Sequence, residues 1–237
     1  MVFTLPDYWM PRPDAPLTAD LARAFDQLID SVPANGGQAL PYALDAPRWQ
    51  FLCYLAEQRE FVLHGSPSGE IDLFEPRQSS DLNEFGAQKA IYAAADGIWP
   101  MFFAILNRQQ HPTSIINACL RVERPLGQMG EPMYFFSVQG DTLALNPWTP
   151  GWVYILPRDS FVREEAIPGG DDTRVHTAQV ASLAPVRPVA RLRVEPRDFP
   201  FLAQVRSHVG ERLAEYAKAL NQGLPLPEEN PQPKTLA

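Results

Sequence analysis

Apolar positions recur with a helical period in several parts of the chain. After Thr18, the apolar residues Leu21, Phe25 and Leu28 follow one another at intervals of three or four. This spacing predicts an amphipathic helix over 18–31, with the Thr18 hydroxyl as its N-cap. Similar patterns predict helices over 47–57, over 98–107 with Asp96 as a cap, and over 201–220.

Between these helices, short runs of β-branched, aromatic and small apolar residues end at glycine or proline. Such runs predict strands. The clearest are Phe61-Val62-Leu63-His64, which stops at a Gly-Ser-Pro turn, and Lys89-Ala90-Ile91-Tyr92-Ala93-Ala94. Further strands are predicted over 114–122, 133–138, 151–156, 175–182 and 189–194.

The proline content supports the same architecture. The chain has 25 prolines in 237 residues, against a usual frequency of about 5%. A bundle of long helices would not tolerate so many residues that lack a backbone N–H. The sequence therefore predicts an α+β fold in which rigid turns join many short strands.

The order of the predicted elements suggests three parts. Residues 1–60 hold a Pro- and aromatic-rich arm and two helices that we expect to pack on the core. Residues 61–222 hold the strand-rich domain with its C-terminal helix. Residues 223–237 are rich in proline and polar groups, which predicts a disordered tail.

The charge balance and the missing targeting signals narrow the function classes. Acidic residues number 28 and basic residues 20, which gives a formal net charge of −8. Bulk binding of nucleic acid needs clustered Lys and Arg, so it is not expected. No apolar run approaches about 18 residues and no signal peptide pattern opens the chain, so we expect a cytoplasmic protein without a membrane partner.

Cysteine and histidine give no metal-binding pattern. Cys53 and Cys119 each stand among apolar residues without CxxC spacing, so both are predicted to be buried thiols. His111, His176 and His208 lie in unrelated contexts. No metal cofactor is therefore expected.

One segment carries residue types that suit a ligand site. His64 ends an apolar strand and is followed by Gly65 and Ser66, and Tyr92 stands in a later strand. A glycine lets a planar group approach the main chain, and a serine hydroxyl both donates and accepts hydrogen bonds. A tyrosine ring can stack on a planar ligand.

This pattern resembles the ADP-ribosyltransferase superfamily of the His-Tyr-Glu type. There, a strand ending in His-Gly-Ser or His-Gly-Thr is followed by a Tyr-Ala strand and a helix. The resemblance covers about residues 61–195 and implies a split pair of small, mostly antiparallel sheets flanked by N- and C-terminal helices. It further implies NAD as substrate, cleavage of the nicotinamide–ribose bond, and transfer of ADP-ribose to a possible protein acceptor or to water.

The resemblance also implies individual roles. His64 would bind a ribose hydroxyl of the adenosine half, Gly65 the nicotinamide carboxamide, and Ser66 the nicotinamide ribose. Tyr92 would stack on the nicotinamide ring. The third position of the family, usually Glu and sometimes Gln, falls on Gln179 in the strand over 175–182.

Several alternatives stay open. Glu164 and Glu165 compete with Gln179 for the third position. Gln179 also suits a solvent-facing position on a strand, and the two glutamates also suit a solvated acidic loop. A glutamine supplies no negative charge, so the protein is either a transferase or NAD glycohydrolase, or a catalytically silent binding module of the same fold. The acidic balance disfavours a related 2′-phosphotransferase activity on RNA.

Overall fold

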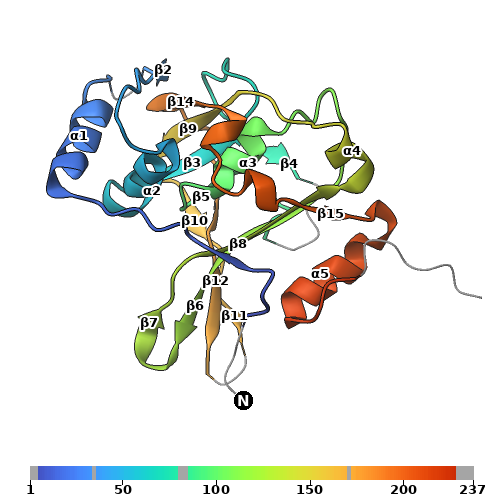
Figure 1. Cartoon of the computed structure of the whole chain (residues 1–237). Coiled ribbons are helices and arrows are strands. Elements are labelled where there is room, and N and C mark those ends of the chain that lie inside the picture. The colour runs from blue at the N-terminus through green and yellow to red at the C-terminus, as the bar shows by residue number, and fades with distance from the viewer. Residues whose placement is uncertain (1–4, 34–35, 80–84, 170–171, 228–237) are drawn as a thin grey trace, which may run out of the picture.

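Two mostly antiparallel sheets meet near the middle of the molecule, with helices packed between and beside them (Figure 1). The computed structural model describes residues 5–33, 36–79, 85–169 and 172–227. Among these residues, helices are interspersed with groups of consecutive strands, without a repeated βαβ unit. The predicted α+β class is confirmed.

The larger sheet contains the strands of the candidate site. In the described part of the chain its strand order is β10-β13-β5-β3-β9-β14-β2, with β4 paired to β5. Every pairing in it is antiparallel except β14 with β2. The strands are β2 (Gln38–Ala39), β3 (Phe61–Ser66), β4 (Arg77–Gln78), β5 (Lys89–Ala94), β9 (Gly151–Pro157), β10 (Val162–Arg163), β13 (Gln179–Ser182) and β14 (Ala190–Val194).

The second sheet is long and narrow. Its described strands follow the order β1-β8-β6-β12-β11, with β15 and β7 attached to β8 and β6. One end, formed by β6, β7, β11 and β12, projects away from the body (Figure 1). The strands are β1 (Met10–Pro11), β6 (Ile115–Arg124), β7 (Gln128–Met129), β8 (Met133–Gln139), β11 (Ile167–Pro168), β12 (Arg174–Thr177) and β15 (Arg206–His208).

The single strand predicted over 175–182 is wrong. The chain leaves one sheet and enters the other at Ala178, between β12 and β13. The Ala178 N–H donates to the Cys119 oxygen of β6 at 3.0 Å, and the Ala178 oxygen accepts from the Ala95 N–H at 2.8 Å. Because β12 pairs with β6 and β13 pairs with β5, this residue joins the two sheets.

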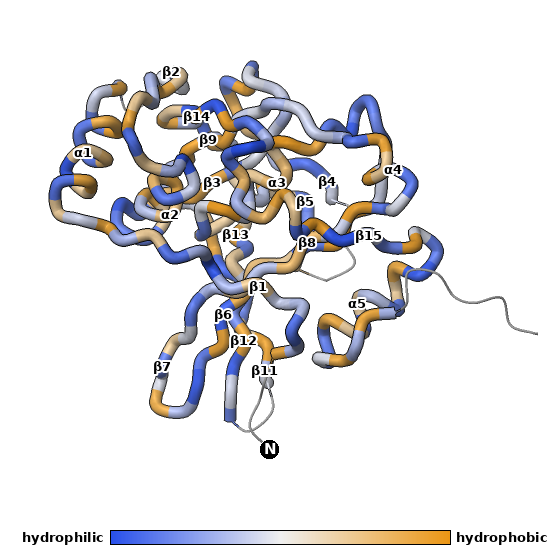
Figure 2. Tube along the Cα trace, viewed as in Figure 1, coloured by the Kyte–Doolittle hydropathy of each residue, from blue (hydrophilic) through white to orange (hydrophobic). Residues whose placement is uncertain are grey.

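The predicted N-terminal helices are confirmed. The helix α1 (Ala19–Asp30) begins after Thr18, whose Oγ1 accepts from the Leu21 N–H at 3.2 Å. The helix α2 (Arg48–Gln58) is buried on most sides. Together with α3 (Trp99–Ile105), α2 contributes to the largest apolar cluster, which also takes residues from both sheets. Figure 2 shows hydrophobic positions gathered where α2, α3, β3 and β9 meet.

Two glycines let α3 lie directly on the larger sheet. A β-carbon at Gly65 of β3 would stand 1.8 Å from the Pro100 oxygen, and one at Gly151 of β9 would stand 1.9 Å from the Ala104 oxygen. Real β-carbons do not approach a carbonyl oxygen so closely. The helix backbone therefore occupies the space that side chains would fill at these positions.

The predicted helix over 201–220 is wrong in its first half. Only α5 (Leu213–Gln222) is helical, and it follows the short 3-10 helices Leu202–Gln204 and Gly210–Arg212. Between these, β15 pairs in parallel with β8. The buried His208 ring lies between the hydroxyls of Ser114 and Ser137, at 2.9 and 2.8 Å. These tertiary hydrogen bonds outweigh the helical spacing of the local sequence. A further short α-helix, α4 (Gly140–Ala144), follows β8.

Part of the predicted tail is described, and it contacts the body. The Tyr8 hydroxyl donates to the Leu224 oxygen at 3.1 Å, and the Tyr216 hydroxyl donates to the Pro227 oxygen at 3.2 Å. Residues 228–237 lie outside the described part of the chain. Among the described helices, none combines the length and apolar character needed to cross a bilayer.

Candidate functional site

The structure brings the strands of His64, Tyr92 and Gln179 next to one another. Their order in the larger sheet is β13-β5-β3, so the Tyr92 strand lies between the other two. Register pairs Gln179 with Ala94 and pairs Leu63 with the same Ala94. Residues far apart in the sequence therefore lie on neighbouring strands.

His64 joins β3 to β5 through its side chain. Its Nδ1 lies 2.7 Å from the Tyr92 main-chain oxygen. A carbonyl oxygen only accepts, so Nδ1 carries the proton and Nε2 of the neutral ring is an acceptor. Burial lowers the pKa of His64, which favours this neutral form. The ring is half-buried and meets the Phe74 ring edge-on, with centroids 4.8 Å apart.

The three side chains do not converge on one face of the sheet. Phe74, against which His64 packs, belongs to an apolar cluster with Ile91, Ala93 and Val180. Because successive side chains on a strand alternate between faces, Tyr92 and Gln179 point to the opposite face.

On that face, Tyr92 and Gln179 are diagonal neighbours, since Tyr92 stands directly across from Ala181. The Tyr92 hydroxyl donates to the main-chain oxygens of Gln88 and Phe85, at 2.9 and 3.0 Å. These bonds fix the ring beside the segment that precedes β5. Tyr92 and Gln179 thus lie together on one face, and His64 is linked to Tyr92 through the Tyr92 main-chain oxygen.

Gly65 and Ser66 have local structural roles. The α3 backbone occupies the side of Gly65 where a β-carbon would point. Gly65 thus permits the close packing of α3, and within the sheet it pairs with Val153 of β9. The Ser66 Oγ accepts from the Ser68 N–H at 3.1 Å and shapes the turn after β3.

The two competing glutamates differ in position. The Glu164 N–H lies 3.4 Å from the Gln179 oxygen, and its carboxylate accepts from the Thr177 hydroxyl at 2.6 Å. Glu165 is exposed. Of the two carboxylates, the structure places Glu164 closer to the Gln179 strand.

A buried polar network connects the N-terminal arm to α3. The Asp96 Oδ1 accepts from the N–H groups of Ile98 and Trp99, both at 2.8 Å, as predicted for a helix cap. Its Oδ2 accepts from the Tyr134 hydroxyl at 2.6 Å and from the Arg12 guanidinium at 3.3 Å. The Asp96 side chain is only 3% exposed.

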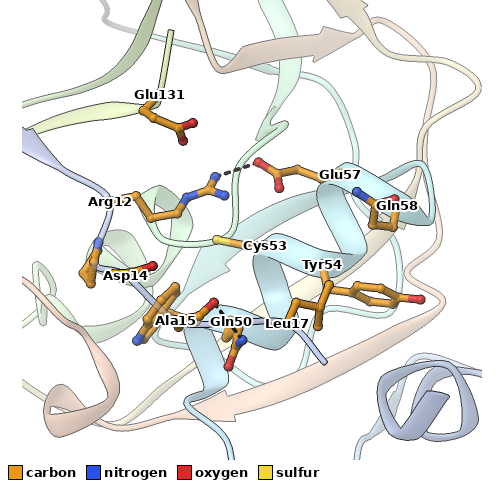
Figure 3. Close-up of a pocket in the computed structure, with 12 residues that line it drawn as sticks. Arg12, Asp14, Ala15, Leu17, Gln50, Cys53, Tyr54, Glu57, Gln58 and Glu131 are labelled. Carbon is orange, nitrogen blue, oxygen red and sulfur yellow. Dashed lines mark hydrogen bonds and ion pairs between the residues drawn. The ribbon is translucent and has the colours of Figure 1, made fainter. Parts of the chain in front are cut away.

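Glu57, at the end of α2, extends this network. Arg12 reaches from the N-terminal arm to the Glu57 carboxylate at 2.7 Å (Figure 3). Arg121 of β6 contacts the same oxygen at 2.6 Å. The capping role of Asp96 was predictable from the sequence. The roles of Arg12 and Arg121 were not, because nothing in their local sequence indicates these distant partners.

Two adjoining cavities border the network. The first, of about 390 Å³, lies between the N-terminal arm and α2 (Figure 3). The second, of about 530 Å³, lies where the two sheets meet. Neither cavity is lined by His64, Gly65, Ser66, Tyr92 or Gln179.

Both cysteines are buried, as predicted. Burial raises the pKa of the Cys53 and Cys119 thiols, so neither is a reactive thiolate at neutral pH. Within the described residues, no group of three or more His, Cys, Asp or Glu side chains is arranged to hold a metal ion.

Comparison with known proteins does not place this chain in a family. No family model matches it, and neither a curated protein nor a solved structure gives a significant match.

Proposed function

We propose that the protein is an NAD-binding domain of the ADP-ribosyltransferase-like type, with its site where β13, β5 and β3 lie side by side. The observation that carries the proposal is the hydrogen bond from the His64 Nδ1 to the Tyr92 oxygen. It connects the two strands that resemble the family motif, and from the opposite face of the sheet His64 thereby helps to position the Tyr92 strand.

Two further features support this proposal. Tyr92 and Gln179 share one face of the sheet as diagonal neighbours, so a ring stacked on Tyr92 would bring its attached ribose near Gln179. The chain also passes from one sheet to the other at Ala178, directly before Gln179. A split pair of sheets is the arrangement that the resemblance implies.

The proposed reaction breaks the bond between the nicotinamide nitrogen and the ribose C1′. Nicotinamide leaves as a neutral molecule with the bonding electron pair, and positive charge develops on the ribose. Water or an acceptor nucleophile then bonds to C1′ and loses a proton. A carboxylate beside the ribose stabilises the developing charge, whereas the amide of Gln179 only donates or accepts a hydrogen bond.

The amide at position 179 favours the second candidate function, a silent NAD-binding module. In this case the domain binds NAD and holds it without cleaving it. The nearest alternative carboxylate, Glu164, is already engaged by the Thr177 hydroxyl. This hydrogen bond occupies one carboxylate oxygen of Glu164 and holds it beside β12.

A nicotinamide-release assay on the Gln179→Glu variant separates the two candidates. If Gln179 stands at the ribose, the added carboxylate raises the rate of nicotinamide release at least tenfold over the wild-type protein. Gln109→Glu adds the same charge at an exposed position and serves as the matched control. NAD binding without release in both wild type and Gln179→Glu would identify a silent module. Absence of NAD binding in both would overturn the proposal.

A further inference from the structure

The cavity where the two sheets meet has a cationic wall. It has a volume of about 530 Å³, which is within the usual range for small-molecule sites. It is bordered by the end of α2, by β6, by β12 and by the segment after β9. Besides Arg12, the arginines that line the cavity are Arg121, Arg158 and Arg163. His176 lines it as well and contacts the Glu123 carboxylate at 2.6 Å.

On the α2 side of this cavity, positive and negative groups are already matched. Glu57 accepts from both Arg12 and Arg121, at 2.7 and 2.6 Å. Asp96 is held by Arg12 and by the Tyr134 hydroxyl. These two carboxylates are therefore already paired. Glu131 also lines the cavity, and it forms no ion pair in the described part of the chain.

On the opposite side, the positive charge is not matched. Arg158 and Arg163 form no ion pair with any carboxylate in the described part of the chain. Arg163 lines the cavity together with Arg121 and Arg158. Desolvation and then repulsion by the charges of Arg158 and Arg121 lower the pKa of Arg163. The free protein bears the cost of this repulsion, and a bound anion would relieve it.

We propose that this cavity binds a small phosphate-bearing ligand through Arg158 and Arg163, with Arg121, which is paired with Glu57, beside them. A guanidinium group matches phosphate oxygens with paired, charge-assisted hydrogen bonds. A phosphate monoester carries nearly two negative charges at neutral pH, which suits several clustered arginines better than one carboxylate does. The proposal is independent of NAD, because none of the residues compared with the family motif lines this cavity.

Calorimetric titration with inorganic pyrophosphate tests this site directly. The wild-type protein binds one pyrophosphate, and its affinity falls as the salt concentration rises. Replacing both arginines, Arg158→Gln and Arg163→Gln, lowers the affinity at least tenfold. Acetate, titrated as a carboxylate probe, binds at least tenfold more weakly than pyrophosphate to the wild-type protein.

Arg197→Gln is the matched control, because this exposed arginine lies outside the cavity, and it retains wild-type affinity. Thermal unfolding without ligand checks that each variant is folded. Arg163→Lys keeps the positive charge, so we expect it to lose less affinity for pyrophosphate than the double variant does. No saturable binding by the wild-type protein would overturn the proposal. The proposal would also be overturned if the double variant bound pyrophosphate as tightly as the wild type, or if the wild type bound acetate as tightly as pyrophosphate.

Discussion

The His64 imidazole donates from Nδ1 to the main-chain oxygen of Tyr92, at 2.7 Å, and so connects β3 to β5 where the two strands share only one register pair. The side chain thereby supplies a bond that a continuous strand ladder would otherwise make. It also determines which ring nitrogen remains an acceptor.

This hydrogen bond predicts the protonation state of His64. At pH 7 the ring is neutral, with the proton on Nδ1, and it titrates below its usual pKa because burial disfavours the charged form. Nitrogen-15 NMR of the imidazole nitrogens measures both properties. A proton on Nε2, or a titration midpoint above about 6.5, would contradict the assignment.

Buried histidines also predict how stability depends on pH. Burial lowers the pKa of His208 in the folded state, whereas the unfolded chain titrates near 6.5. As the pH falls below about 6.5, the unfolded state binds a proton that the folded state does not, so the free energy of unfolding decreases. Above pH 7 both states are neutral, and this contribution is constant.

Urea unfolding between pH 5 and pH 8 tests this linkage. Each such histidine contributes a slope of up to about 1.4 kcal/mol per pH unit below its unfolded pKa. His208→Gln removes one titrating group, so its stability declines less steeply with falling pH than that of the wild type. Parallel slopes in the two proteins would show that His208 does not cause the effect. The slope is the readout, whatever the variant's absolute stability.

Gly65 is predicted to be essential for folding. In Gly65→Ala, the new methyl group meets the Pro100 oxygen at 1.8 Å, and α3 must move away from β3. We expect a loss of about 3 kcal/mol or more, at the upper end for overpacked cores. Gly140→Ala is the control, because its nearest neighbour is a side-chain carbon at 3.7 Å. Similar melting temperatures for the two variants would contradict the described packing of α3.

Asp96 is predicted to hold the N-terminal arm and α3 together. Asp96→Ala removes the acceptor for two helix N–H groups, for Tyr134 and for Arg12, with an expected cost of about 3 kcal/mol or more. Asp96→Asn keeps a capping oxygen and should cost less. Chemical denaturation measures both.

The surface pair of Arg23 and Asp20 provides the comparison for Asp96, since both side chains are largely exposed. Arg23→Ala should change the free energy of unfolding by no more than about 0.5 kcal/mol. If Arg23→Ala lowered the free energy of unfolding as much as Asp96→Ala does, burial would not explain the importance of Asp96.

Local signals in the sequence were sufficient for the elements that depend on local chemistry. Thr18 caps α1, Asp96 caps α3, and the bounds of β5 match the predicted strand. The signals failed where tertiary pairing decides the structure. The β12–β13 segment has a continuous strand pattern, but its two halves pair with different sheets at Ala178.

The candidate site shows the same division. Sequence patterns could place His64, Tyr92 and Gln179 on strands, but the face to which each side chain points depends on register. The register separates His64 from the other two. The cationic wall was not predictable either, because Arg121, Arg158 and Arg163 lie apart in the sequence and meet only when β6 lies beside the segments after β9.

Calorimetric titration of the purified protein with NAD is the most direct test of the proposed function, using wild type, His64→Ala, Tyr92→Ala and the control Gln109→Glu. We predict saturable one-site binding by the wild type and the control. Both site variants, confirmed as folded by circular dichroism, should lose at least tenfold in affinity. No NAD binding by the wild-type protein, or unchanged affinity in both folded site variants, would contradict the account.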